Sequence, residues 1–332
     1  MLDSKTEAFE KIKPGCRLAD RKNFNQTIAD ISLACTERMA GLANSVVAES
    51  IKILSDPPPC SFSVFAIGSL ARGEATPFSD FEYLFVVKDL NSEGQEYFKN
   101  LAITIYFLIG NLQETKLSYM AIEELLGWFD DCSINGFKID GLSKDAGNIP
   151  TGNGLPEKEN HFIMTPESFI KRYAYTLINP DEDEALRGDF TAMVKYMRLV
   201  YQFGEADLLA SLKQGIQASR PNRARMNANL EMFKSDICKF DFTPHGDLDS
   251  MNFTWNVKRQ LYRFPSIILL DLAIMHNITE ENVWKSSNQM CERGVVSAHI
   301  ACDLSFLLAS ACYIRLAAYL YHGSQDDRIS IG

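Results

Sequence analysis

Hydrophobic residues recur at helical spacing in the first long segment of the chain. Between residues 24 and 55 the apolar positions follow one another at intervals of three and four, which predicts one long helix or two. The run Pro57–Pro59 ends this pattern. Two short apolar runs follow, FSVFAI at 62–67 and FEYLFVV at 81–87. Continuous apolar runs of this length are typical of buried strands.

The middle of the chain predicts the end of a first domain. Helical spacing over residues 93–114 indicates a helix packed on the sheet, and GFKID at 136–140 indicates another short strand. Residues 141–160 are rich in Gly, Pro, Asn and charge, which is typical of a linker or an active-site loop. We therefore expect two domains, residues 1–150 and 151–332.

Beyond residue 160 the spacing is helical almost throughout. Thr165 is expected to cap a helix that has Pro166 at its first position. The apolar residues of 190–204 form a helical stripe, and further helices are expected near 206–218, 221–239, 252–276, 279–291 and 295–322. The fold class is therefore predicted to be α+β, a small α/β domain with a short mixed sheet followed by an all-α helical bundle.

Composition narrows the range of functions. With 46% hydrophobic and 23% charged residues the chain has a globular composition, and its net charge of -10 makes a polyanion an unexpected main partner. The eight cysteines are scattered without a C-x-x-C pair, as in the reduced thiols of a cytoplasmic protein. The start of the chain lacks the apolar run of a signal peptide. The most apolar stretch contains His299, Asp303 and Arg315, so we expect a buried bundle helix and no membrane span.

The stretch GSLARGEATPFSDFEY, residues 68–83, carries the candidate chemistry. The Gly68–Ser69 turn after the first strand leaves backbone N–H groups at a helix start, where an anion such as phosphate binds. Asp80 and Glu82 are two residues apart at the entry to the second strand, so both side chains are expected on one face. Their mutual repulsion is relieved by a divalent cation with oxygen ligands, such as Mg²⁺. Phosphoryl or nucleotidyl transfer uses this combination.

The same stretch resembles the signature of the DNA polymerase β-like nucleotidyltransferase superfamily, which is Gly-Ser, a spacer, and Asp-x-Asp or Asp-x-Glu. More closely, it is similar to the Gly-(Gly/Ser)-x-x-Arg-Gly-Glu-x-x-Pro-x-Ser-Asp-x-(Asp/Glu) stretch of PII-protein uridylyltransferases and of related signal-transduction nucleotidyltransferases. The resemblance implies an α/β catalytic domain and an enzyme that transfers a nucleoside monophosphate from ATP, UTP or another NTP to a hydroxyl, releasing pyrophosphate.

The resemblance also implies roles for the matching residues. The NTP would be held by residues of the turn and the loop that follows it, namely Gly68, Ser69, Arg72 and Ser79. Asp80 and Glu82 would ligate two Mg²⁺ ions, although Glu82 stands where Asp is more usual. A third carboxylate, which ligates metal and helps deprotonate the acceptor hydroxyl, is assigned to Asp140. Its competitors are Asp130, Asp131 and Asp145.

Each of these residues also has a structural interpretation. A Gly-Ser turn on its own is usually just a turn, Asp80 alone could be a cap, and Arg72 with Glu74 could form a surface ion pair of little consequence. In the second half of the chain, Lys195, Lys258, Arg259 and Arg263 could face the triphosphate, but each is better explained as a solvated helix residue. Tyr196 and Tyr262 are better explained as core residues than as base-stacking ones.

The acceptor remains open among three classes. A protein side chain is expected, because the nearest resemblance is to protein-modifying enzymes. A small cationic molecule, as in aminoglycoside nucleotidyltransferases, is the alternative enzymatic acceptor. RNA is less favoured because no basic cluster interleaved with aromatic residues is present. A catalytically inactive nucleotide-binding module is the non-enzymatic alternative. The five histidines show no metal-ligand spacing, so a phosphohydrolase activity finds no support.

Overall fold

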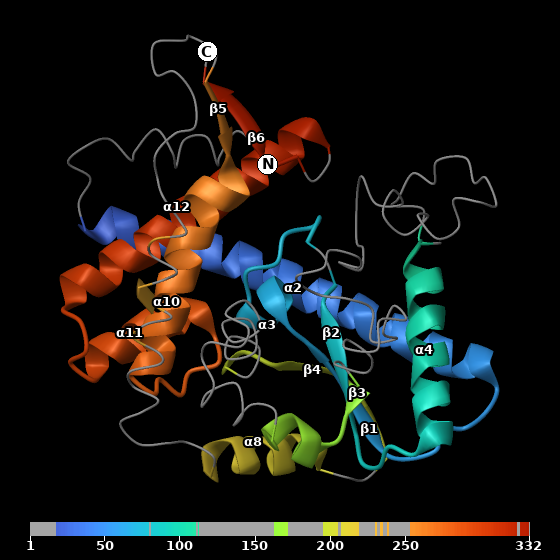
Figure 1. Ribbon diagram of the computed structural model, residues 1–332. Coiled ribbons are helices and arrows are strands. Elements are labelled where there is room, and N and C mark those ends of the chain that lie inside the picture. Colours follow the sequence, from blue (N-terminus) through green and yellow to red (C-terminus); the bar gives the residue numbers. More distant parts are fainter. Residues whose placement is uncertain are drawn as a thin grey trace. The chain divides into compact units, whose positions relative to one another are not determined.

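In the computed structural model the chain forms two compact units (Figure 1). The structure describes residues 18–79, 81–110, 112, 163–171, 195–204, 207–218, 230, 233–234, 238, 253–323 and 326–331. We call the part within Thr36–Ala228 the sheet unit, and the part within Met1–Cys35 and Asn229–Gly332 the helical unit. The predicted domain boundary at residue 150 falls outside the described residues, as do the predicted strand at 136–140 and the segment 141–160.

The sheet unit contains a mixed four-stranded sheet in the order β3-β2-β1-β4. The two predicted apolar runs form β1 (Phe62–Ala66) and β2 (Tyr83–Val87), which pair antiparallel with Ala66 opposite Tyr83. Strand β3 (Ile163–Met164) runs parallel to β2, and β4 (Arg198–Phe203) runs antiparallel to β1. The α+β fold class with a short mixed sheet and a C-terminal region of several helices is thereby confirmed.

Helices cover both faces of this sheet, which explains why every residue of β1 and β2 is buried. One face packs against α2 (Leu18–Leu54) and α4 (Ser92–Gly110) through alternate strand residues such as Val64 and Phe85. The other face packs against α8 (Leu208–Ala218) through Phe65, Leu84 and Val86. The predicted helices at 24–55 and 93–114 correspond to α2, which is one continuous helix, and α4.

The expectation of a helix over residues 190–204 is wrong for residues 198–203. Residues 198–203 form β4, because this segment pairs with β1 more than 100 residues earlier in the chain, with Phe203 opposite Phe62. Tertiary pairing has overridden the helical spacing of the apolar residues. The cap at Thr165 is confirmed, since its Oγ1 accepts a hydrogen bond from the Ser168 N–H at 3.2 Å and residues 166–171 are helical.

The helical unit is built from α10 (Arg263–Met275), α11 (Val283–Glu292), α12 (Ala298–His322) and the first part of α2. Phe24 of α2 lies against Phe306 and Tyr313 of α12, with ring centroids 5.8 and 6.0 Å apart. The expected helices at 279–291 and 295–322 are therefore confirmed, and 206–218 is helical from Leu208 as α8.

The expected helix at 252–276 is only partly correct. Its first residues form β5 (Phe253–Asn256), which pairs antiparallel with β6 (Arg328–Ile331), as Figure 1 shows. The π-helix η2 (Val257–Tyr262) follows β5 and leads directly into α10. The partner of β5 lies over 70 residues later, so the local pattern could not predict this strand.

Helix α12 is long and apolar enough to cross a membrane, judged by length and composition alone, and it is the one such helix in the described part of the chain. Core helices of globular proteins share these properties. Its Arg315 is buried, and the Arg315 Nε donates a hydrogen bond to the Tyr319 hydroxyl at 2.7 Å. A buried, hydrogen-bonded arginine fits the expected bundle helix.

Candidate functional site

The candidate site begins where β1 and β2 leave the sheet. The Ile67 N–H donates to the Glu82 carbonyl oxygen at 2.9 Å, which continues the antiparallel pairing by one residue beyond the strands. Immediately after Ile67 the chain forms α3 (Gly68–Arg72), a helix of five residues. This pairing brings the Gly68–Ser69 turn next to Glu82.

Gly68 and Glu82 are in direct contact. A β-carbon at position 68 would lie only 1.6 Å from Glu82 Oε2, so the carboxylate occupies the space that a side chain would need. Gly68 also has a φ of +65°, a conformation that favours glycine. The residue expected to hold a triphosphate and the residue expected to ligate metal therefore lie side by side.

The aromatic neighbours of Glu82 determine the side of the sheet on which it lies. The rings of Phe81 and Tyr83 stack with centroids 4.6 Å apart, and both rings are buried in the core beneath α2 and α4. Since successive side chains of an extended segment alternate, Glu82 belongs to the opposite face, which it shares with Leu84. Asp80 lies outside the described residues, so its sharing of a face with Glu82 stays a prediction.

Arg72 and Glu74 form a buried ion pair. The Arg72 Nε donates to Glu74 Oε2 at 2.7 Å, the Glu74 side chain is 0% exposed, and that of Arg72 is 19% exposed. The Glu74 N–H also donates to the Ser69 carbonyl oxygen at 2.9 Å, across Gly73 in the left-handed conformation. An ion pair between Arg72 and Glu74 was one of the interpretations of the sequence, but it was expected on the surface, whereas the Glu74 side chain is fully buried. Its carboxylate fixes one edge of the Arg72 guanidinium.

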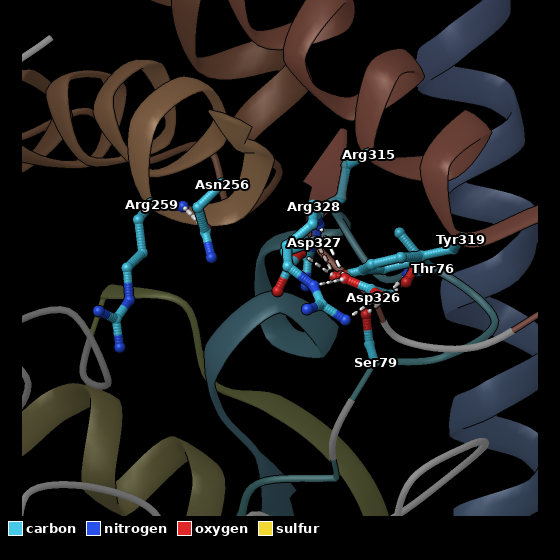
Figure 2. A network of polar contacts seen from close by, with 9 residues as sticks. All are labelled: Thr76, Ser79, Asn256, Arg259, Arg315, Tyr319, Asp326, Asp327 and Arg328. Carbon is cyan, nitrogen blue, oxygen red and sulfur yellow. Dashed lines mark hydrogen bonds and ion pairs between the residues drawn. The ribbon is translucent and has the colours of Figure 1, made fainter. Parts of the chain in front are cut away.

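Ser79 stabilises the loop that leads into β2. Its Oγ accepts a hydrogen bond from the Thr76 N–H at 2.8 Å, and its own N–H donates to the Thr76 carbonyl oxygen at 3.0 Å (Figure 2). The side chain is buried, so these contacts account for a serine at this position. A contact between Ser79 and a nucleotide stays a prediction.

A contact that the sequence did not predict holds the same loop from α2. The Ala75 N–H donates to Thr36 Oγ1 at 3.3 Å, and Thr36 is fully buried. Arg198, which lies opposite Ala66 at the end of β1, forms an ion pair with Glu37 on the next position of α2. No local signal marks Thr36 or Glu37, because their partners are distant in the sequence.

Of the residues predicted to bind metal, only some lie in the described part of the chain. Glu82 is described, whereas Asp80 and Asp140 lie outside the described residues, as do Asp130, Asp131 and Asp145. Within the described ranges no group of three or more His, Cys, Asp or Glu side chains could hold a metal ion. Carboxylate oxygens such as those of Glu82 are ligands that suit Mg²⁺.

Several other candidates are placed by the structure. Tyr196 and Tyr262 are buried, as expected of core residues. Lys195 lies just before β4, in the sheet unit, and its Nζ lies 4.8 Å from the centroid of the Tyr196 ring. Lys258 and Arg259 lie on η2, in the helical unit, and Arg263 follows at the start of α10. A role for any of these cations in binding a triphosphate stays a prediction.

Comparison with known proteins connects the site to a family. No curated protein matches the chain. A family model matches residues 16–112, a range that contains α2, β1, α3, β2 and α4 and thus the whole GSLARGEATPFSDFEY stretch. The closer likeness to PII-protein uridylyltransferases stays a prediction. The matching model is described as Putative nucleotidyltransferase DUF294, so residues 16–112 are similar to that family, which is consistent with the nucleotidyltransferase superfamily.

Proposed function

We propose that this chain is a Mg²⁺-dependent nucleotidyltransferase that moves a nucleoside monophosphate from an NTP to a hydroxyl group. The observation that carries the proposal is the contact between Gly68 and Glu82 within the segment that matches the nucleotidyltransferase family. It brings a glycine turn and a carboxylate together at one end of a buried strand pair. An NTP with its metal ion needs backbone N–H groups for the phosphates and a carboxylate for the metal, close to each other.

The proposed reaction is an in-line displacement at the α-phosphorus of the NTP. The acceptor oxygen forms a bond to that phosphorus, the bond from the phosphorus to the bridging oxygen of the β-phosphate breaks, and pyrophosphate leaves with the bonding electrons. The proton of the acceptor hydroxyl passes to a carboxylate, for which Asp140 is our candidate. Mg²⁺, when bound by Asp80 and Glu82, would neutralise charge on the reacting phosphates.

The residues of the loop then have separate roles. The backbone N–H groups of Gly68 and Ser69, at the start of α3, would donate hydrogen bonds to phosphate oxygens. Arg72, whose Nε donates to Glu74, would approach a phosphate of the NTP. Thr76 and Ser79 would keep the loop in shape, and Ser79 would also contact the nucleotide.

The acceptor that we propose is a protein side chain, and the location that we propose is the cytoplasm. The resemblance of residues 68–83 to protein-modifying enzymes supports the acceptor. The net charge of -10 is unfavourable for a nucleic acid acceptor, but it is compatible with a small cationic one. The experiment must therefore offer both protein and small cationic acceptors.

The test is transfer of label from α-³²P-labelled NTPs, with Mg²⁺, to cell lysate proteins and separately to aminoglycosides, with pyrophosphate release measured in parallel. We expect labelled protein and release of pyrophosphate, both reduced about a hundredfold or more in Glu82→Gln. The matched control is Glu96→Gln, which changes an exposed carboxylate of α4 in the same unit and should keep full activity. Equal activity of the Glu82→Gln enzyme and the wild type would contradict the proposal, as would NTP binding without any pyrophosphate release.

A further inference from the structure

A cluster of cations lies on the π-helix of the helical unit. The Arg263 N–H donates to the Lys258 carbonyl oxygen, a hydrogen bond between residues five apart that defines the wide π turn. In an α-helix, residues five apart point about 140° away from each other. In the π turn they lie about one turn apart, so Lys258, Arg259 and Arg263 belong to a single turn of the helix.

The backbone of this π turn is held in place at its start. Asn256 Oδ1 accepts from the Arg259 N–H at 2.8 Å, and Gln260 Oε1 accepts from the Asn256 N–H at 2.7 Å, which is a reciprocal cap. On the inner side Val257 is fully buried, and its N–H donates to the Asp327 carbonyl oxygen at 2.7 Å. The turn is therefore a built feature of the fold.

A buried contact between Tyr262 of η2 and Arg315 of α12 also holds the turn in place. Tyr262 is 4% exposed, and the Arg315 guanidinium carbon lies 4.5 Å from the centroid of its ring. Arg315 is itself held by Tyr319, as Figure 2 shows. One side of η2 is thus fixed against α12, which leaves its other side to carry the cations.

The outer side of the turn concentrates positive charge in an acidic chain. Arg259 and Arg263 are exposed, and in the part of the chain that the structure describes neither guanidinium has an ion-pair partner. In Figure 2 the Arg259 side chain extends away from Asn256 and from the Arg315 network. Neighbouring like charges repel. The π turn is a rare geometry that occurs frequently at functional sites.

We infer that Lys258, Arg259 and Arg263 form a binding surface for a polyphosphate, the chemistry shared by pyrophosphate and the nucleoside triphosphates. The exposed Arg259 and Arg263, with Lys258 in the same turn, match a compact ligand that carries several negative charges at pH 7, as pyrophosphate and the nucleoside triphosphates do. The planar forks of two arginines suit phosphate oxygens on neighbouring phosphorus atoms.

The test is calorimetric titration of the full chain with sodium pyrophosphate, in the absence of Mg²⁺ and at low salt. We expect the dissociation constant to rise about tenfold or more in Arg259→Gln and in Arg263→Gln. The matched control is Lys285→Gln, which removes one exposed cation from α11 of the same unit and should change the constant less than twofold. Unchanged thermal unfolding of the three variants shows that each is folded.

Parallel titrations with inorganic phosphate, ATP and AMP identify the source of the ligand. Tighter binding of ATP than of pyrophosphate assigns the surface to a nucleotide, and the reverse order assigns it to free pyrophosphate. The inference is overturned if pyrophosphate does not bind at millimolar concentration. It is also overturned if the two arginine variants bind like Lys285→Gln. Because the readout is binding alone, the outcome is independent of whether the chain transfers nucleotides.

Discussion

The carboxylate of Glu82 lies against the α-carbon of Gly68, at a distance that leaves no room for a β-carbon. The antiparallel pairing of β1 with β2 creates this contact, because the Ile67 N–H and the Glu82 carbonyl oxygen are hydrogen-bonded. Any side chain at position 68 would therefore collide with the Glu82 carboxylate. A substitution of Gly68 is expected to move Glu82, whatever its effect on substrate binding.

Replacing Gly68 with alanine should reduce activity more than stability. The left-handed φ of +65° is unfavourable for alanine, so we expect the free energy of unfolding to fall by about 1–2 kcal/mol. The new β-carbon would displace the Glu82 carboxylate, which is the end of a flexible side chain, and pyrophosphate release should fall well beyond the loss in folded protein. Urea unfolding and the release assay check both parts.

The control for this change is Gly41→Ala on α2. A β-carbon at position 41 would meet nothing within 4 Å, so the substitution should leave activity intact and raise helix stability by up to about 1 kcal/mol. Full nucleotidyl transfer by Gly68→Ala, with Glu82→Gln inactive, would show that the position of the Glu82 carboxylate is not critical.

Removing Glu74 should destabilise the sheet unit. The side chain is fully buried and accepts from the Arg72 Nε, so Glu74→Ala removes one partner of a largely buried cation. Loss of one member of a buried pair costs about 3–5 kcal/mol, and the partial exposure of Arg72 favours the lower end. Glu74→Gln, which keeps an acceptor oxygen, should cost less. Urea unfolding measures both.

An exposed ion pair provides the contrast. Glu49 and Lys52 form a contact of 2.9 Å on α2 with both side chains more than half exposed, so Glu49→Ala should cost no more than about 1 kcal/mol. Similar losses for Glu49→Ala and Glu74→Ala would contradict the importance that we assign to burial.

Removing the Tyr319 hydroxyl should destabilise the helical unit. It accepts from Arg315 Nε at 2.7 Å and donates to Asp327 Oδ1 at 2.5 Å (Figure 2). Burial raises the pKa of Tyr319, so the hydroxyl keeps its proton and remains a donor to Asp327. We expect Tyr319→Phe to lower the free energy of unfolding by about 1.5–3 kcal/mol, because hydrogen bonds to charged groups are lost. Tyr321→Phe, at a residue that is 87% exposed, should have no effect.

Stability at acid pH should depend on Asp326. A hydrogen bond from the Arg328 side chain lowers the pKa of Asp326 to about 2, below its unfolded value of about 3.9. A lowered pKa in the folded state stabilises the protein above the unfolded pKa, so this contribution is present above about pH 4 and is lost as the pH falls to about 2. Urea unfolding between pH 5 and pH 2 should therefore show a smaller loss for Asp326→Asn. Parallel profiles for the two proteins would contradict the prediction.

Prediction from sequence succeeded where local pattern and local contacts agree. The strands β1 and β2, the helices α2 and α4, and the cap at Thr165 all follow from spacing and from residues close in the chain. It failed for β4 and β5, whose partners lie far away in the sequence. It also missed the π turn of η2, because helix prediction rests on apolar spacings of three and four residues, whereas the buried Val257 and Tyr262 are five residues apart.

Residue types and short spacings were enough to predict the α+β class, the two central strands, and the motif whose order of Gly68, Ser69 and Glu82 indicates nucleotidyl transfer. They did not predict that Glu82 touches Gly68, that the Arg72–Glu74 pair is buried, or that the start of α2 packs with the C-terminal helices. Burial and contact depend on neighbours from distant segments, such as the Thr36 hydroxyl that accepts from the Ala75 N–H and the Phe306 ring that packs on Phe24.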